Sequence, residues 1–175
     1  MKPRPCTIFY FLVCALFFPG SGRADDISYS DAHVKAAYIL KLRNFVQWPT
    51  HVKPNNICVV GSDLIGVSLA QLQRSLPDSS DIQVIRKSLT SSFDECNIVF
   101  ISESSADIMR QILFSTEGKP VLTISDIGSF VDRGGMIGFV TIDQKIKMEL
   151  NVPNAERNGL VASSKILEIA YRVLK

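Results

Sequence analysis

Three short apolar runs without polar alternation constrain the fold of this chain most strongly. They are ICVV at 57–60, NIVFIS at 97–102 and VLTIS at 121–125. A strand that is apolar at nearly every position is covered on both faces, whereas a strand with one face in water alternates. Helical segments are expected between these runs. The pattern therefore predicts a mostly parallel, Rossmann-like sheet with helices on both faces, in an α/β three-layer sandwich.

Other elements are placed by apolar periodicity. A further strand is expected over 82–86, and helices are expected over 30–47, 62–76, 103–114 and 164–174. The buried face of the first helix is expected to hold Val34, Ala37, Tyr38, Leu42 and Phe45. The last helix is expected to pack through Ile166, Leu167, Ala170 and either Val173 or Leu174.

The C-terminal third follows a different pattern. Gly134-Gly135 indicates a turn, and the segments MIGFVTI (136–142) and KIKMELN (145–151) flank Asp143-Gln144 as the two strands of a hairpin. In the second strand, apolar residues alternate with Lys145, Lys147 and Glu149. Charged alternation of this kind is typical of an exposed edge strand, where lysines deter pairing with another sheet.

The first residues are typical of a secretory signal peptide. Lys2 and Arg4 precede an apolar stretch at 7–18, and small residues at Gly22 and Ala24 permit cleavage before Asp25. The apolar stretch is shorter than the about 20 residues that a membrane-spanning helix needs. We therefore expect residues 1–24 to be removed and residues 25–175 to form a single domain in the periplasm.

The charge of the expected mature domain is close to zero. The full chain has 19 basic and 17 acidic residues, and three of the basic ones (Lys2, Arg4 and Arg23) leave with the signal peptide. The remaining 16 basic residues face 17 acidic ones, which gives a net charge of −1. This balance does not indicate binding to nucleic acid, and no direct membrane insertion is expected.

Two of the four cysteines, Cys58 and Cys96, remain after the expected cleavage. An exported chain with two cysteines usually pairs them, and a structural disulfide is the preferred interpretation. A disulfide that also reports the redox state and two free thiols are the alternatives. Both cysteines lie at the amino-terminal side of strands that can be neighbours, whereas ligands bind at the carboxyl ends of such strands. A bridge here would stabilise the scaffold, away from any ligand site.

Residues for catalysis are sparse. The only histidines, His33 and His51, have no metal-ligand spacing, and the sequence contains no GxSxG motif for a nucleophilic serine. We therefore expect no enzyme activity, no metal site and no cofactor. An alternative function is a periplasmic sensor that binds a small ligand in a crevice at the strand ends, lined by Gly61, Ser102 and Ser125. Ordinary turn and helix-capping roles explain the same residues more simply.

Several segments, in order along the chain, resemble the YfiR/HmsC family. They are FVQWP (45–49), ICVVGSD (57–63), CNIVFIS (96–102), KPVLTISD (119–126), GGMIGFV (134–140) and KMELNVPNAERNGLVASSKILEIA (147–170). The resemblance implies a YfiR-like periplasmic α/β sandwich that binds the periplasmic domain of an inner-membrane diguanylate cyclase. It also implies repression of cyclic di-GMP synthesis and biofilm formation, and sequestration of the repressor by an OmpA-like outer-membrane lipoprotein. By motif match, Cys58 and Cys96 correspond to a disulfide pair in relatives, and this chain lacks the second pair that some members carry in the C-terminal third.

A protein of this kind acts through its surface. The candidate partner-binding residues are on the hairpin and the loop before it: Phe130, Arg133, Phe139, Lys145, Lys147 and Glu149. Ordinary protection of a sheet edge is the preferred interpretation of these residues. A homodimer formed through a sheet edge or a helix is left open by the sequence.

Overall fold

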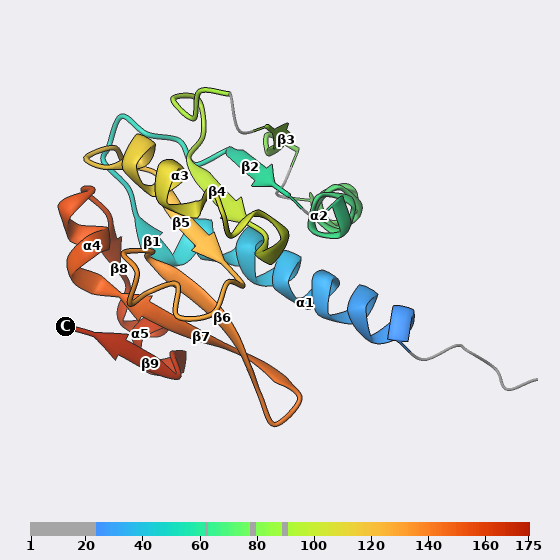
Figure 1. Cartoon of the computed structure of the whole chain (residues 1–175). Helices are drawn as coiled ribbons and strands as arrows, with labels where there is room; N and C mark the ends of the chain where they lie inside the picture. The colour runs from blue at the N-terminus through green and yellow to red at the C-terminus, as the bar shows by residue number, and fades with distance from the viewer. Residues whose placement is uncertain (1–23, 62, 78–79, 89–90) are drawn as a thin grey trace, which may run out of the picture.

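The computed structural model describes residues 24–61, 63–77, 80–88 and 91–175 (Figure 1). Apart from Ala24, the expected signal peptide lies outside these residues. The described residues form a seven-stranded sheet with the order β3-β2-β4-β5-β6-β7-β9. In that order the strands are β3 (Gln83–Lys87), β2 (Asn56–Val60), β4 (Ile98–Ile101), β5 (Leu122–Ser125), β6 (Ile137–Ile142), β7 (Lys145–Asn151) and β9 (Arg172–Leu174).

The pairing of the strands confirms the predicted mixed α/β sheet. Neighbouring strands from β3 to β6 are parallel, β6 and β7 are antiparallel, and β9 is parallel to β7. The hairpin turn lies at Asp143 and Gln144, as predicted, and both residues have positive φ angles, of 49° and 59°. Two successive left-handed residues match the twist of a two-residue hairpin.

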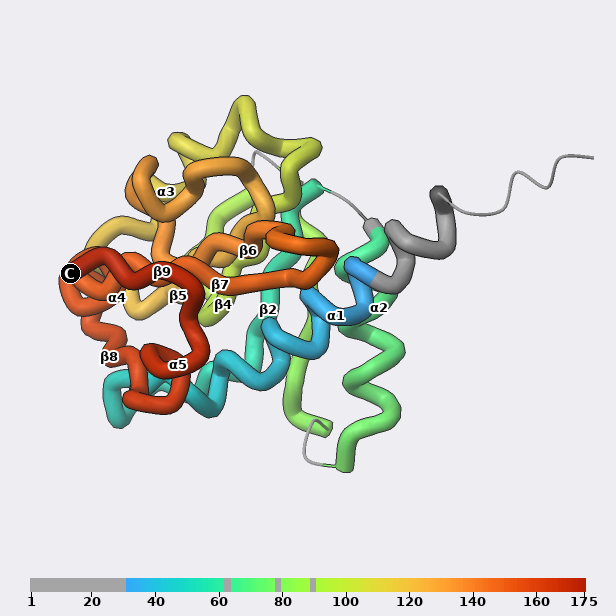
Figure 2. The backbone as a smooth tube through the Cα atoms, turned by 90° about the horizontal axis from the view of Figure 1, so that it is seen from below, coloured from blue at the N-terminus to red at the C-terminus, as the bar shows by residue number. Residues whose placement is uncertain are grey.

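Side chains from one strand enter two different cores. Ile57 and Val59 of β2 pack in the core beneath the helices α1 (Ala24–Phe45) and α2 (Asp63–Ser75). Cys58 and Val60 pack on the opposite face, in the core beneath α3 (Met109–Thr116). Figure 2 shows the sheet between α3 on one side and α1 on the other, with α2 beside α1. Burial on both faces explains why the central strands are apolar throughout.

The buried face of α1 agrees with the prediction in part, because Leu42 is buried and Tyr38 and Phe45 pack partly buried against the same core. The helix begins at Ala24, before the expected start, and buries Ala32, Ala36, Ile39, Leu40 and Leu42, while Val34 is 41% exposed. Ala32 and Ala36 are small residues on this buried face, which the periodicity of large apolar residues does not reveal. After the helix ends, Trp48 Nε1 donates a hydrogen bond to the Arg43 carbonyl at 2.9 Å, which satisfies one of the free carbonyls of the last turn.

The predicted helix over 164–174 is wrong in its second half. Helix α5 (Ser164–Ile169) ends early, and β9 follows it. The Tyr171 amide donates to the Met148 carbonyl at 2.8 Å, and Val173 pairs with Leu150. Residues 172–174 therefore pair as a strand with residues 149–151 of β7, so this part of β7 is not at the sheet edge.

The structure departs from the expected pattern in three further details. The helix expected over 103–114 is divided into a 3-10 turn, η2 (Glu103–Ser105), and α3. A short helix, α4 (Val152–Arg157), follows β7. Two short strands, β1 (Val46–Gln47) and β8 (Val161–Ala162), pair antiparallel beside the main sheet.

Candidate functional site

The three residues predicted to line a crevice come together at the carboxyl-terminal ends of neighbouring strands. Gly61 follows β2, Ser102 follows β4, and Ser125 ends β5. Val60 pairs with Ile101, which pairs in turn with Ser125, so these carboxyl ends lie at one level. Because the chain continues from β2 to one side and from β4 to the other, this is the position where ligands bind in open α/β sheets.

Serine side chains fill the space next to Gly61. Gly61 has a φ of +97°, and a Cβ atom built on it would lie 2.5 Å from Ser105 Oγ and 2.8 Å from Ser104 Oγ. The hydroxyl of Ser102 accepts a hydrogen bond from the Ser104 amide at 3.4 Å and so caps η2. The glycine is needed for this close approach and for the left-handed turn.

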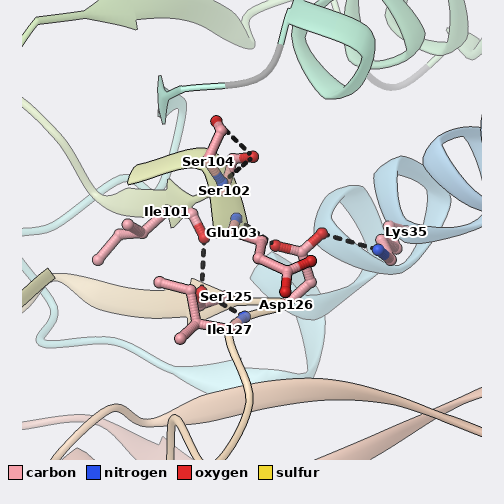
Figure 3. A network of polar contacts seen from close by, with 8 residues as sticks. All are labelled: Lys35, Ile101, Ser102, Glu103, Ser104, Ser125, Asp126 and Ile127. Carbon is pink, nitrogen blue, oxygen red and sulfur yellow. Dashed lines mark hydrogen bonds and ion pairs between the residues drawn. The ribbon is translucent and has the colours of Figure 1, made fainter. Parts of the chain in front are cut away.

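A closed polar network lies beside these serines (Figure 3). Lys35 Nζ of α1 lies 2.7 Å from Asp126 Oδ2, and each of these two side chains is 17% exposed. Asp126 Oδ1 accepts from the Glu103 amide at 2.8 Å. Ser125 Oγ donates to the Ile101 carbonyl at 2.5 Å and accepts from the Ile127 amide at 3.0 Å. The network joins α1, η2 and β5. The groups named here already form hydrogen bonds or an ion pair within the protein.

The described part of the chain contains no group of three or more His, Cys, Asp or Glu residues placed to hold a metal ion. Over the same residues, no helix combines the length and apolar character that crossing a membrane requires.

Cys58 and Cys96 form a disulfide, which confirms the preferred pairing. Their Cα atoms are 5.8 Å apart, and the two residues are 0% and 2% exposed. Cys58 follows Ile57, which pairs with Ile98 of β4, so the bridge joins the amino-terminal sides of two neighbouring strands. It lies at the end of the sheet opposite the Asp126 network, in the core beneath α3.

Half of the predicted partner-binding residues are buried. Phe130, Phe139 and Glu149 are 1%, 3% and 8% exposed, so the expectation that they form an accessible surface is wrong. The ring of Phe130 occupies the space where Gly135 lacks a side chain. Phe139 faces Tyr38 of α1, with ring centroids 6.0 Å apart. These aromatic residues hold the hairpin against the body of the protein.

The other three predicted residues, Arg133, Lys145 and Lys147, are exposed. We call Lys145 and Lys147, which both lie on β7, the basic hairpin surface. Arg133 lies on the loop before β6, at the end of the hairpin away from its turn. The role of these three residues in binding a partner stays a prediction.

Glu149 is buried because Arg172 binds it. Arg172 Nε lies 2.8 Å from Glu149 Oε1, and Nη2 lies 3.0 Å from Oε2. The same guanidinium makes two bonds to Asp132, at 2.9 Å and 2.7 Å. Hydrogen bonding to Asp132 and then Glu149 raises the pKa of Arg172, and hydrogen bonding to Arg172 lowers the pKa of Asp132. The three residues are far apart in sequence, and alternation along β7 gave no signal of the pairing.

Sequence reasoning also missed a pocket of about 320 Å³ between α3 and α4. Three arginines line it: Arg110 on α3, Arg133 on the loop before β6, and Arg157 on α4. Thr123 of β5 and Met136 also line the pocket, and the Met136 amide donates to Thr123 Oγ1 at 3.2 Å.

Comparison with known proteins gives two findings. A family model described as YfiR/HmsC-like matches residues 32–171. Among solved structures, the chain is similar to a conserved domain protein from Vibrio cholerae O1 biovar eltor str. N16961, with a TM-score of 0.55 and 13% sequence identity. The similarity covers 82% of this chain and 60% of that one. At 13% identity, the similarity to this solved structure shows a shared fold and nothing about function.

Proposed function

The chain belongs to the YfiR/HmsC-like family, and from that premise we propose that it represses an inner-membrane diguanylate cyclase by binding the periplasmic part of that enzyme. Membership of the family makes it a periplasmic regulator of cyclic di-GMP signalling in general. Repression lowers cyclic di-GMP synthesis and with it biofilm formation. The observation that carries the proposal is the family match, which extends from α1 to Tyr171.

The architecture supports a role in recognition. A disulfide between neighbouring strands and buried aromatic rings behind the hairpin hold the scaffold rigid, which lowers the entropy lost on binding. The basic hairpin surface is exposed on this scaffold. A partner with an acidic patch would complement it, and charge complementarity of this kind favours specificity and fast association.

Relief of repression is part of the same proposal. An OmpA-like outer-membrane lipoprotein sequesters the regulator and frees the cyclase, as the family resemblance implies. A homodimer is a further element of the proposal. The C-terminal edge favours it, because β9 pairs with a described strand on one side only and Ile169 and Tyr171 beside it are 59% and 56% exposed.

The test uses a strain that carries the cognate cyclase. Deleting the gene for this protein should raise cyclic di-GMP and surface attachment, and a plasmid copy should restore both. The control is the same deletion in a strain whose cyclase lacks activity, where no rise is expected. Purified regulator should also bind the purified periplasmic domain of the cyclase saturably. Unchanged cyclic di-GMP in the deletion strain, with the cyclase present at its normal level, would refute repression.

A further inference from the structure

We propose that the pocket between α3 and α4 binds a small anionic molecule that carries a carboxylate or phosphate group together with a hydrogen-bond donor. The pocket has a volume of about 320 Å³. Sites for small molecules typically measure about 300–1,000 Å³ and combine apolar walls with a few placed polar groups. The proposed site is distinct from the basic hairpin surface, and its existence does not depend on the proposed cyclase.

The charge of the pocket favours an anion. Arg110, Arg133 and Arg157 reach it from three separate segments, and Glu117 is the acidic residue among those that line it. Within the described residues, none of the three arginines forms an ion pair, in contrast to Arg172, which holds two carboxylates. Guanidinium groups bind carboxylate and phosphate through paired hydrogen bonds, so three of them on one cavity suit such a ligand.

A buried acceptor on the same cavity indicates the second feature of the ligand. Asn158 is 5% exposed and lines the pocket. Its Nδ2 atom donates to the Asn154 carbonyl at 2.8 Å, which orients the amide, and its Oδ1 atom has no hydrogen-bond partner among the described residues. A buried acceptor without a partner is unfavourable. A hydroxyl or ammonium group on the ligand would supply the missing donor.

Asn154 holds the walls of the pocket in place. Its side chain donates to the Gly134 carbonyl on the loop before β6 and accepts from Arg157 Nη2 at 3.1 Å. One residue therefore connects the loop that carries Arg133 to the helix that carries Arg157. Arg157 is thus held before binding, which lowers the entropy lost when a ligand enters.

The rim supplies an apolar contact. Phe114 of α3 lines the pocket and is 80% exposed, an unusual position for a phenylalanine. Its ring and the buried Met136 give an apolar surface next to the arginines. The ligand is thus a compact anion whose carbon skeleton contacts Phe114.

Isothermal titration calorimetry on the mature protein at low ionic strength tests the proposal with two probes. Citrate carries carboxylates and a hydroxyl, and O-phosphoserine carries a phosphate and an ammonium group. Tricarballylate, which is citrate without the hydroxyl, and serine are the matched controls. We expect saturable binding of citrate or O-phosphoserine. O-Phosphoserine also carries a carboxylate, so binding of O-phosphoserine without binding of serine would assign the recognition to the phosphate. Tricarballylate, which lacks the hydroxyl, should bind more weakly than citrate, and serine, which lacks the phosphate, should bind more weakly than O-phosphoserine.

Variants locate the binding. Arg133→Gln and Arg157→Gln replace exposed residues, and each should weaken binding about tenfold by removing a charged hydrogen bond. Arg74→Gln, on the exposed face of α2, is the control and should leave binding unchanged. Asn158→Leu should remove the difference between citrate and tricarballylate. The proposal is overturned if neither probe binds at millimolar concentration, or if both arginine variants bind as the wild type does.

Discussion

Arg172 Nη2 lies 2.7 Å from Asp132 Oδ2, and this contact joins the last strand of the sheet to the loop before β6. The same guanidinium holds Glu149 of β7 at 2.8 Å. Because Glu149 is only 8% exposed, Arg172 provides the countercharge that allows a carboxylate to be buried there. One side chain thus fixes β9, β7 and the loop relative to one another.

Arg172→Ala should lower the urea midpoint of unfolding more than Asp132→Asn does. The arginine variant leaves Glu149 buried without its partner, which is strongly unfavourable, whereas the asparagine variant removes only an exposed contact. Arg110→Ala, at an exposed residue of α3, is the control. Equal losses in the first two variants would show that Glu149 does not depend on Arg172.

The Asp132 contact should make stability depend on pH at the acid end. Hydrogen bonding to Arg172 lowers the pKa of folded Asp132, so the unfolded chain binds more protons between the two pKa values and stability rises with pH there. The contribution is complete above the ordinary Asp pKa of about 4 and is lost as the pH falls through the lowered value. Urea midpoints from pH 2 to pH 7 should therefore converge for wild type and Asp132→Asn in acid. Asp107→Asn, another exposed aspartate, provides the comparison.

Removing the disulfide should destabilise the protein without additivity. Cys58→Ser, Cys96→Ser and the double variant should each lower the free energy of unfolding by about 4 kcal/mol, because each opens the same loop, in which the cysteines are 38 residues apart. Equilibrium urea unfolding measures this, with reduced wild type as the reference. A double variant much less stable than either single variant would contradict the shared cause.

Gly61→Ala should destabilise the protein more than Gly118→Ala. Both residues have positive φ angles, of 97° and 70°, so each substitution strains the backbone by about 1–2 kcal/mol. Only at Gly61 does the added methyl group meet Ser105 and Ser104, which should add roughly 1–3 kcal/mol for overpacking. Thermal and urea unfolding of the pair separates crowding from backbone strain. Equal losses would mean that the serines move aside.

Reversing charge on the hairpin tests its role in binding. Lys145→Glu combined with Lys147→Glu should weaken binding to the cyclase domain about tenfold and raise cyclic di-GMP, while the unfolding midpoint stays within error because both side chains are exposed. Lys53→Glu combined with Lys165→Glu, also exposed, is the matched control. Full repression by the hairpin variant would place the interface elsewhere.

The central strands could be predicted from the sequence because burial on both faces requires apolar residues at successive positions. The segments around Ile57, Ile98 and Leu122 have continuous apolar runs, and each became a strand of the parallel sheet. The turn at Asp143-Gln144 was predictable because two apolar segments flank it and aspartate tolerates a positive φ angle, although glutamine at the second position does so less readily.

Features that depend on distant residues could not be predicted. Residues 172–174 became a strand because β7 offered an open edge, although the local pattern favours a helix. Glu149 was expected at the surface because its partner lies 23 residues later in the chain. Gly61, Ser102 and Ser125 were correctly expected at one edge of the sheet, but packing decides that serine hydroxyls occupy the space next to Gly61.

The Cys58–Cys96 bond turns part of the chain into a covalent ring that contains α2 and β3. A protease that cuts the backbone once inside this ring would leave both pieces attached to each other. The nicked molecule would migrate as a single species in a denaturing gel until a thiol reagent is added. Damage in this part of the molecule would therefore escape detection by size, and the cut ends would stay tethered to the sheet.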